Sequence, residues 1–590
     1  MANFSSLATA VSGLRAAQTG LAVTGHNMAN SEILGYARQR VTQKDFFYKD
    51  AGMSLNGNMK MVGLGTDTNA IMQIRNKFLD ITYRNLNTKL NFYAVKSTTG
   101  AIVEDILGEM QGAYRFQSVI NDIWNAMQEL SVHPEGIETR DKFLATCEIF
   151  VNKANEVYES LFAYQLNLDR QIRATVDEIN ELVTRVNQLN TLIRANEAAG
   201  DYANDYRDER NLCLDKLSAL VPIDYYEDTY GNISIFTDGH QLLNQNSQHF
   251  MGLKYVSGMY SFVEPVFTSS KEILPSDTPP NQYEAYVKLH KPINAYNNND
   301  DGALKALIIS RGAMPATYRG ADMLVMPVDP GPLATQQQKN DYLAALHTYN
   351  FNKWSVENCL IPKVQMQVDL IVNKIVTMIN DAVAPYLADR TKDPDAPYDL
   401  RGSQSYVEIF VRKDVPRFDP ITGLYNTEDV PLNLGEVTTY YSQYSIGNIK
   451  LNPLLLDSED GFNLMPFSPS PFADRDDNRI ILDLLHKWRS NDPENGVLIN
   501  GLYYRIQDAY QQLVTQFAIE IEEADNFLTN TAIQVNEADY KRQSIMSVSL
   551  DEELRNMMTY QYAYQSAARI LNTIDSMIDR VVNGMGRVGL

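Results

Sequence analysis

Cysteine is scarce in this chain. Only Cys147, Cys213 and Cys359 occur among 590 residues, and no two of them have the spacing of a metal-binding or redox motif. A small scaffold held together by disulfides needs many more cysteines, so the sequence excludes that class of protein. The three cysteines are expected to be small, buried, apolar residues.

Positive charge and long apolar runs are also missing. The 51 Lys and Arg residues face 73 Asp and Glu residues, which gives a formal net charge of −22 at pH 7. A chain this acidic repels phosphate backbones and anionic lipid headgroups, so neither nucleic acid nor a membrane is an expected partner. No run of about 18 apolar residues predicts a membrane-spanning helix. Residues 1–22 lack the basic and apolar regions of a cleavable secretory signal.

Catalytic and metal-binding motifs are absent as well. The seven histidines are scattered, and none forms H-E-x-x-H or a pair at i, i+4 spacing. The P-loop and the hydrolase nucleophile elbow do not occur. Partial matches at 297–302 and 584–589 lack the bidentate glutamate of a calcium loop and the flanking strand of a dinucleotide site. The sequence therefore predicts no enzyme activity, no cofactor and no metal.

What the chain does contain is a core-forming composition and long helical patterns. Apolar residues make up 44% of it, and its length suggests about three or four domains. The longest helical pattern covers residues 143–196, or roughly 75 Å. Other helices are expected over 78–93, 119–130, 341–361, 364–384 and 502–528. Rods of this length are typical of elongated structural proteins.

Each end of the chain carries one apolar stripe at helical spacing. The N-terminal stripe contains Phe4, Leu7, Val11, Leu14 and Leu21, and the C-terminal stripe contains Leu550, Leu554, Met557, Tyr564, Ala568, Leu571, Ile574 and Ile578. The C-terminal positions repeat nearly as heptads. Isolated amphipathic helices are marginal in water, so each stripe needs a partner. That partner is either the other end of the same chain or a neighbouring subunit.

Two stretches between the helices have a β-like composition. Between 221 and 267, apolar runs flank Tyr230-Gly231-Asn232, which predicts a hairpin. Residues 392–471 are rich in Pro, Asp, Tyr and Asn and contain alternating segments, which predicts a small β-rich insert. The predicted fold class is therefore mainly α with β-rich inserted domains, in an elongated multidomain chain. Its terminal helices pair as a coiled coil, and a long helical bundle forms the middle domain.

The expected domains follow the same patterns. A terminal helical coiled-coil domain combines 1–33 with 548–590, and 34–95 form a linker and the start of the helical domain. Residues 96–385 form the long-helix domain with a β excursion at about 221–295. Residues 386–499 form the β-rich insert, and 500–547 form the return helix of the helical domain.

Both ends also resemble a known family. The run FSSLATAVSGLRAAQTGLAVTGHNMANSEILGYARQRV resembles the flagellar rod and hook signature, with matching positions Asn27, Asn30, Gly35, Tyr36 and Arg38. The run SVSLDEELRNMMTYQYAYQSAARILNTIDSMID is similar to the C-terminal motif of the same family. The ending of the first motif resembles the first hook-associated protein family, FlgK, more than the rod proteins. Weaker resemblance occurs at 203–225, 302–311 and 477–488.

The resemblance implies a structural junction subunit that joins the flagellar hook to the filament by helical self-assembly. It implies further copies of the chain, the hook protein and the second hook-associated junction protein as partners, and a cytosolic export chaperone on the C-terminal helix. It also implies export by the flagellar type III system to an extracellular position in the flagellum. That location replaces the cytoplasmic one that the missing signal peptide alone would suggest.

The expected assembly interface combines the two apolar stripes with the signature residues Asn27, Asn30, Gly35 and Tyr36. One alternative is another flagellar axial protein, such as the hook protein or the second junction protein. The hook protein should be mostly β between its ends, whereas this chain has long helices there. Another alternative is a hydrolase hosted in 392–471, where the absence of His and Cys leaves only carboxylate chemistry.

Overall fold

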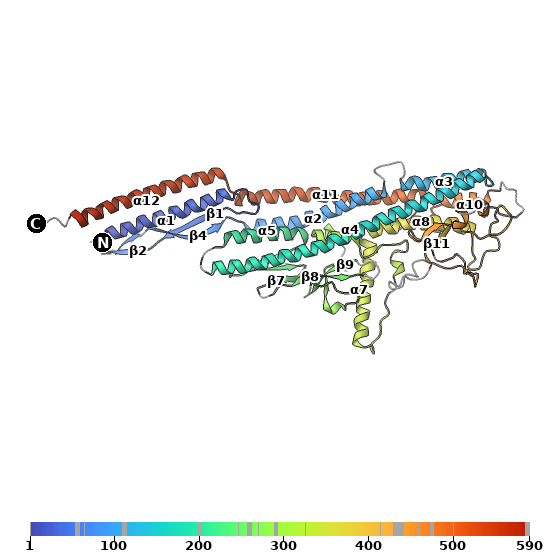
Figure 1. Ribbon diagram of the computed structural model, residues 1–590, viewed down its shortest axis with the longest axis horizontal. Helices are drawn as coiled ribbons and strands as arrows, with labels where there is room; N and C mark the ends of the chain where they lie inside the picture. The colour runs from blue at the N-terminus through green and yellow to red at the C-terminus, as the bar shows by residue number, and fades with distance from the viewer. Residues whose placement is uncertain are drawn as a thin grey trace. The chain divides into compact units, whose positions relative to one another are not determined.

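A computed structural model describes most of the chain (Figure 1). The described residues are 2–53, 59–63, 65–108, 115–198, 200, 202–245, 247–256, 262–268, 271–287, 293–324, 326–413, 415–428, 442–456, 461–471, 477–499 and 501–584. Side chains are described for all of these except 2–5, 48–53, 59–62, 323, 581, 583 and 584.

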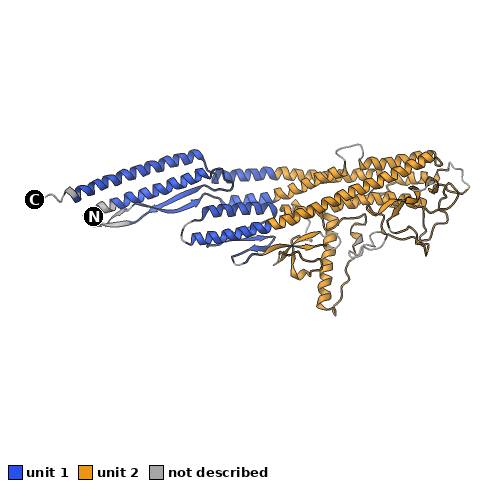
Figure 2. Ribbon diagram, viewed as in Figure 1, with its two compact units in different colours: residues 1–88, 179–248, 531–590 blue, residues 89–178, 249–530 orange. Residues whose placement is uncertain are grey.

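The chain divides into two compact units, each made of segments that are distant in sequence (Figure 2). Unit 1 comprises Met1–Thr88, Ile179–Gln248 and Thr531–Leu590, and unit 2 comprises Lys89–Glu178 and His249–Asn530. Both ends of the chain therefore belong to the same unit. None of the described helices is long and apolar enough to cross a membrane.

Most of the described residues are helical. The helices are α1 (Ala2–Ala29), α2 (Lys77–Leu107), α3 (Phe116–Val132), α4 (Ile137–Glu197), α5 (Asn204–Leu220), α6 (Ala303–Arg311), α7 (Gln336–Asn358), α8 (Leu360–Val383), α9 (Pro453–Leu456), α10 (Arg479–Trp488), α11 (Ile506–Met546) and α12 (Leu550–Gly584). Short 3-10 turns occur at η1 (Pro280–Gln282), η2 (Ala295–Asn297), η3 (Gly320–Met323) and η5 (Gly461–Leu464).

The strands are short and form small antiparallel sheets. The two-stranded sheets pair β1 (Gln39–Asp45) with β4 (Thr66–Gln73), β2 (Tyr48–Met53) with β3 (Met59–Gly63), β11 (Phe410–Arg412) with β12 (Ile449–Leu451), and β13 (Val497–Ile499) with β14 (Leu502–Tyr504). The three-stranded sheets are β5 (Asp224–Glu227), β6 (Ile233–Thr237) and β7 (His240–Leu243), and β8 (Phe250–Tyr255), β9 (Val263–Thr268) and β10 (Glu284–Ala285). The predicted class, mainly α with small β parts in several domains, is confirmed. The coiled-coil geometry of the terminal pair stays a prediction.

The long central helix follows directly from its apolar spacing. The sequence predicts a helix over 143–196, and α4 extends it to 61 residues. Its apolar side chains recur at three- and four-residue steps, so they lie on one face. That face is buried along its length, at Leu161, Leu168, Ile172, Ile179, Val183, Val186, Leu189 and Ile193.

Two predicted helix boundaries are wrong. The sequence places a break at Pro362, but α7 ends at Asn358 and α8 begins at Leu360, so this proline lies in the first turn of α8. A first-turn N–H has no partner within the helix, so proline is tolerated there. The helix predicted from residue 502 begins only at Ile506, because Leu502–Tyr504 pair with Val497–Ile499 as a hairpin.

The hairpin predicted at Tyr230-Gly231-Asn232 is confirmed. It connects β5 to β6, and Gly231 has a φ of +81°, a conformation that glycine adopts without strain. The Asp228 carboxylate accepts the backbone N–H groups of Tyr230 (2.8 Å) and Asn232 (2.9 Å). An aspartate that bonds its own turn in this way fixes the position of the reversal.

The strands within 386–499 are shorter than the alternating pattern predicts, and residues 429–441 lie outside the described part of the chain. β11 and β12 have three residues each. In this region, buried arginine side chains donate hydrogen bonds to loop carbonyls. These bonds take the place of the backbone hydrogen bonds that longer strands would form. Arg412 donates to the carbonyls of Pro416 (3.3 Å) and Asn426 (3.1 Å), and Arg417 donates to that of Ala384 (2.9 Å). Backbone groups satisfied by side chains do not need strand partners.

Candidate assembly site

Helices α1 and α12 lie side by side in unit 1 and run antiparallel (Figure 1). A Cβ built at Gly13 would lie 4.0 Å from Ala567, and one built at Gly20 would lie 2.6 Å from the ring of Tyr560. The residue number falls along α12 as it rises along α1, which fixes the direction. A side chain at position 20 would force the Tyr560 ring to move. The two ends of a single chain therefore pair with each other.

Small side chains form the closest part of this pairing. The buried residues of the two helices include Ala10, Ala16, Ala17 and Val23 on α1, and Ala567 and Ile574 on α12. The predicted N-terminal stripe lies beside these alanines, and its described members are partly buried. The spacing of large apolar residues does not reveal this face. The repeated Ala and Gly of α1 are the signal that could have found it, because small residues let two helix backbones approach closely.

The structure separates the predicted interface residues into groups. Asn27 and Ile574 are buried, and Leu7, Val11, Leu14, Leu21, Asn30, Gly35, Tyr36, Met557, Tyr564, Ala568, Leu571 and Ile578 are partly buried. Leu550 and Leu554 are 50% and 47% exposed, so neither is a buried seam residue in the single chain. Phe4 belongs to α1, but its side chain lies outside the described part of the chain.

α12 keeps a row of apolar side chains uncovered in the single chain. Leu550, Leu554, Met558 and Tyr562 follow one another at four-residue steps, and all four are exposed. Ile570 and Met577 add exposed apolar surface farther along the helix. We call these six side chains the outer row of α12. Beside the residues buried against α1, the helix thus keeps six apolar side chains that are about half exposed or more in the single chain.

The loop after α1 is held by Asn27. The side-chain oxygen of Asn27 accepts the Gln39 backbone N–H (3.0 Å) and the Tyr36 hydroxyl (2.7 Å). Its side-chain nitrogen donates to the Gln39 carbonyl (2.9 Å). Asparagine offers a donor and an acceptor on one short side chain, which this closure requires. The signature asparagine therefore fixes the exit of the chain from α1.

Asn30 and Gly35 shape the same loop. The Asn30 side chain donates to the His26 carbonyl at the end of α1 (3.0 Å). Gly35 has a φ of +86°, and a Cβ there would lie 3.4 Å from Leu212 of α5. The left-handed backbone and the close neighbour both favour glycine.

Arg38 joins the N-terminal signature to the C-terminal motif. Its guanidinium contacts Glu553 (2.7 Å) and Glu552 (2.9 Å) in the first turn of α12, and its backbone N–H donates to the Met546 carbonyl (2.9 Å). The near-heptad spacing predicts that Leu554 is buried. Glu553 is buried instead, because it is only 2% exposed. Carboxylates are also favoured at a helix N-terminus by its partial positive charge.

Two acids of α5 complete the site, and sequence reasoning missed both. Asp205 accepts a hydrogen bond from the Gln39 side chain (3.0 Å), and Asp208 accepts the Ala37 backbone N–H (3.1 Å). Arg75 lies 3.5 Å from the second oxygen of Asp208. The family resemblance at 203–225 covers both acids, but their spacing alone does not show that they contact residues 37–39.

Mild acid should stabilise unit 1 through Asp208. Burial raises the pKa of this carboxyl to about 7, with Asp205 and Asp80 adding to the effect and Ala37 and Arg75 opposing it. The folded chain therefore binds the proton more tightly than the unfolded chain, whose carboxyl has the ordinary pKa of 3.8. This stabilisation is complete below about pH 4 and is lost as the pH rises through about 7. We expect the free energy of unfolding to gain about 2 kcal/mol from this site at pH 5 relative to pH 8.

Urea unfolding at the two pH values measures this gain, with Asp208→Asn as the comparison. The variant has no titrating carboxyl at position 208, so its pH dependence should be smaller by that amount. An identical pH dependence in both proteins would show that Asp208 does not titrate in this range.

The other titratable clusters give no metal site in the part of the chain that the structure describes. No group of three or more His, Cys, Asp or Glu residues there is arranged to hold an ion. All three cysteines are buried, as predicted, and burial raises the pKa of each thiol.

Known families match the middle and the end of the chain. Residues 101–321 match the family described as flagellar hook-associated protein FlgK helical domain. Residues 544–584, which include α12, match the family described as flagellar basal body rod FlgEFG protein C-terminal. The second match therefore covers the whole of the helix that Arg38 holds.

Full-length relatives agree with these matches. Flagellar hook-associated protein 1 of Bacillus subtilis (strain 168) is 25% identical over 589 residues, covering 99% of this chain and 98% of that protein. The protein of the same name from Salmonella typhimurium is 21% identical and covers 97% and 98% of the two chains.

A solved structure shows the shared fold. The flagellar hook junction protein FlgK from Burkholderia pseudomallei superimposes with a TM-score of 0.51 at 12% identity, over 80% of this chain and 100% of that one. The family matches, the full-length relatives and the common fold lead to one conclusion: the chain carries a match to the FlgK helical domain and is similar over almost its whole length to flagellar hook-associated protein 1.

Proposed function

We propose that this chain is a structural adaptor that joins the flagellar hook to the filament, and that it assembles through α1 and α12. The observation that carries the proposal is the outer row of α12. A soluble chain rarely leaves a long apolar row exposed unless a partner covers it. Burial of each such side chain contributes roughly 1.5–3 kcal/mol, so a few contacts per neighbour are enough for a stable polymer.

The two faces of α12 have separate roles in this proposal. The inner face packs on α1 of the same chain, through Ala567 and Ile574. The outer row, which begins with Leu550 and Leu554, packs on α1 or α12 of a neighbouring copy. The predicted terminal domain of 1–33 and 548–590 is then the assembly domain, and its helices line an inner tube.

The signature loop supports this division of roles. Asn27, Asn30, Gly35 and Tyr36 bond within the chain and set where α1 ends, so they act on assembly by positioning rather than by direct contact. The residues predicted to form the assembly interface therefore include some that position the helices and others that contact a neighbouring copy.

The remaining partners follow from the family. The hook protein lies on one side of the proposed junction and the second hook-associated junction protein on the other. A cytosolic chaperone covers the outer row of α12 before export by the flagellar type III system. A chaperone is needed because unassembled copies of the chain would otherwise associate through their exposed apolar side chains before they reach the junction. The proposed role is structural and requires neither a catalytic residue nor a cofactor.

Electron microscopy of flagella from a strain that lacks this chain tests the proposal. We expect hooks of normal length that carry no filament, and recovery of filaments when the full chain is supplied. Filaments attached to hooks in the deletion strain would overturn the junction role. Absence of hooks as well would point to another axial position, such as the hook or the rod.

A further inference from the structure

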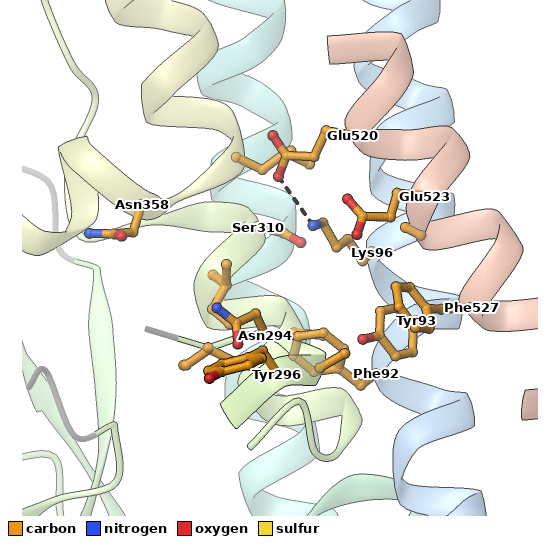
Figure 3. A pocket seen from close by; sticks show the side chains of 16 residues that line it. Phe92, Tyr93, Lys96, Asn294, Tyr296, Ser310, Asn358, Glu520, Glu523 and Phe527 are labelled. Carbon is orange, nitrogen blue, oxygen red and sulfur yellow. Dashed lines mark ion pairs between the residues drawn. The ribbon is translucent and has the colours of Figure 1, made fainter. Parts of the chain in front are cut away.

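Unit 2 contains a cavity of about 450 Å³ that the proposed assembly does not use (Figure 3). It is lined by α2, α6, α11, residues 293–296, the end of α7 and the start of α8. Its volume lies within the roughly 300–1,000 Å³ range of small-molecule sites. Figure 3 shows aromatic side chains on one side of the cavity and charged side chains on the other.

The aromatic side has a fixed part and a free part. Tyr93 stacks on Phe527 with 5.0 Å between ring centroids, and its hydroxyl donates to the buried Asp300 carboxylate. Phe92 is buried beside them, whereas Tyr296 is 95% exposed. A tyrosine that exposed contributes almost nothing to the core, so both faces of its ring are available to a ligand.

The charged side carries no net charge. Lys96 lies 3.1 Å from Glu520, and Lys363 lies 3.4 Å from the other oxygen of the same carboxylate. Glu523, one turn farther along α11, is exposed and makes no ion pair within the described residues. Lys363 is not part of the lining, but counted with Lys96 it balances the two carboxylates that line the cavity. This balance favours neither an anion nor a cation as the ligand.

Uncharged polar groups complete the lining. The Asn294 side-chain oxygen accepts the Asn297 N–H (2.9 Å), so its nitrogen is left to donate. The Asn358 nitrogen donates to the Trp354 carbonyl (2.9 Å), so its oxygen is left to accept. Ser310 adds a hydroxyl that can do either. The cavity therefore offers donors and acceptors in similar number, next to an exposed ring.

We propose that this cavity binds a neutral sugar, with a pyranose ring lying on Tyr296 and its hydroxyl groups bonded to Lys96 and Glu523. A pyranose is uncharged, presents an apolar face of C–H groups, and carries several hydroxyls that each donate and accept. Those three properties match the neutral charge, the free aromatic ring and the mixed donors and acceptors of the cavity. The site is separate from the proposed assembly helices, so its function is additional to the junction role.

Saturation-transfer difference NMR on the full chain tests the site. The probes are the methyl glycosides of glucose, galactose, mannose and N-acetylglucosamine, with tetramethylammonium as the cationic comparison. We expect at least one glycoside to receive saturation, most strongly at the C–H protons of one ring face. Tyr296→Ala should weaken its binding about fivefold, because stacking on an aromatic ring is worth roughly 0.5–1.5 kcal/mol.

Two further variants separate the site from general effects. Glu523→Gln should weaken binding about fivefold, because a charged acceptor bonds a hydroxyl more strongly than an amide does. Tyr230→Ala is the matched control, since this tyrosine is also exposed but belongs to unit 1, and it should bind as the original chain does. Both altered cavity residues are exposed, so neither change should affect folding.

Three outcomes would overturn the proposal. The first is that no glycoside receives saturation, and the second is that binding is unchanged in both Tyr296→Ala and Glu523→Gln. The third is that tetramethylammonium binds at the cavity and the glycosides do not, which would make it a cation site. Loss of hook–filament joining in the deletion strain is independent of all three, so the two proposals can fail separately.

Discussion

Leu554→Asp should abolish filament attachment and leave the single chain folded. Leu554 is 47% exposed and belongs to the outer row of α12, so its carboxylate stays in water in the free protein. In the proposed assembly the same side chain is covered by a neighbouring copy, where an unpaired carboxylate costs several kcal/mol. Repeated at every subunit of a ring, that cost should prevent assembly. Filament counts by electron microscopy and swimming in soft agar measure the effect.

Leu333→Asp is the matched control for this change. It makes the same substitution at a leucine that is 99% exposed and lies outside the terminal helices. Cells that produce the Leu333→Asp protein should keep their filaments and swim. Circular dichroism of purified Leu554→Asp should match that of the original chain. Normal filament numbers in the Leu554→Asp strain would show that the outer row is not an assembly contact.

Arg38→Ala should release α12 from the signature loop. The change leaves the carboxylate of Glu553, which is 2% exposed, without its cationic partner. Removing one partner of a buried ion pair costs about 3–5 kcal/mol. We therefore expect rapid proteolysis between α11 and α12 in the variant and faster amide hydrogen exchange in the first turns of α12.

Two companion variants test the cause. Glu552→Ala removes the more exposed partner of Arg38 and should cost less than about 1 kcal/mol. Combining Arg38→Ala with Glu553→Gln removes the stranded charge and should restore part of the protection. If Arg38→Ala alone resists proteolysis as well as the original chain does, then Arg38 does not hold α12 in place.

The parts of the fold that depend on local periodicity could be predicted from the sequence. The spacing of Leu168, Ile172 and Ile179 predicts one buried face, and α4 buries that face. The Tyr230-Gly231-Asn232 turn depends on one glycine conformation and on Asp228, three residues before Gly231, so it is local as well. Neither feature requires knowledge of a distant segment.

The orientation of α12 could not be predicted in the same way. The near-heptad spacing makes Leu554 a seam position, but the structure turns Glu553 inward because Arg38 binds it. That contact joins residues 515 positions apart, and no local pattern contains it. The close approach at Gly20 depends on the Tyr560 ring in a similar way. The position of Asp208 could not be predicted either, because its carboxylate accepts the Ala37 backbone N–H from a distant part of the sequence.

The sheets of 386–499 show another limit of pattern reading. Alternation around Phe410–Arg412 predicts strands, but strand length depends on which groups bond the neighbouring carbonyls. Arg412 bonds the Asn426 carbonyl and Arg417 bonds the Ala384 carbonyl. From the sequence alone, a charged residue in a polar segment is expected to lie on the solvent-exposed surface. Here both arginines are buried, and the loops fold around them.

The contact between Arg38 and Glu553 also sets an order of events during translation. A ribosome makes the chain from its N-terminus, so Arg38 emerges when the acids that bind it, 515 residues later, do not yet exist. α1 likewise has to wait for α12, whose Tyr560 fills the space above Gly20. The face of α1 that packs on α12 therefore stays uncovered until synthesis is almost complete. Throughout that interval its apolar stripe is accessible to any factor that meets the growing chain.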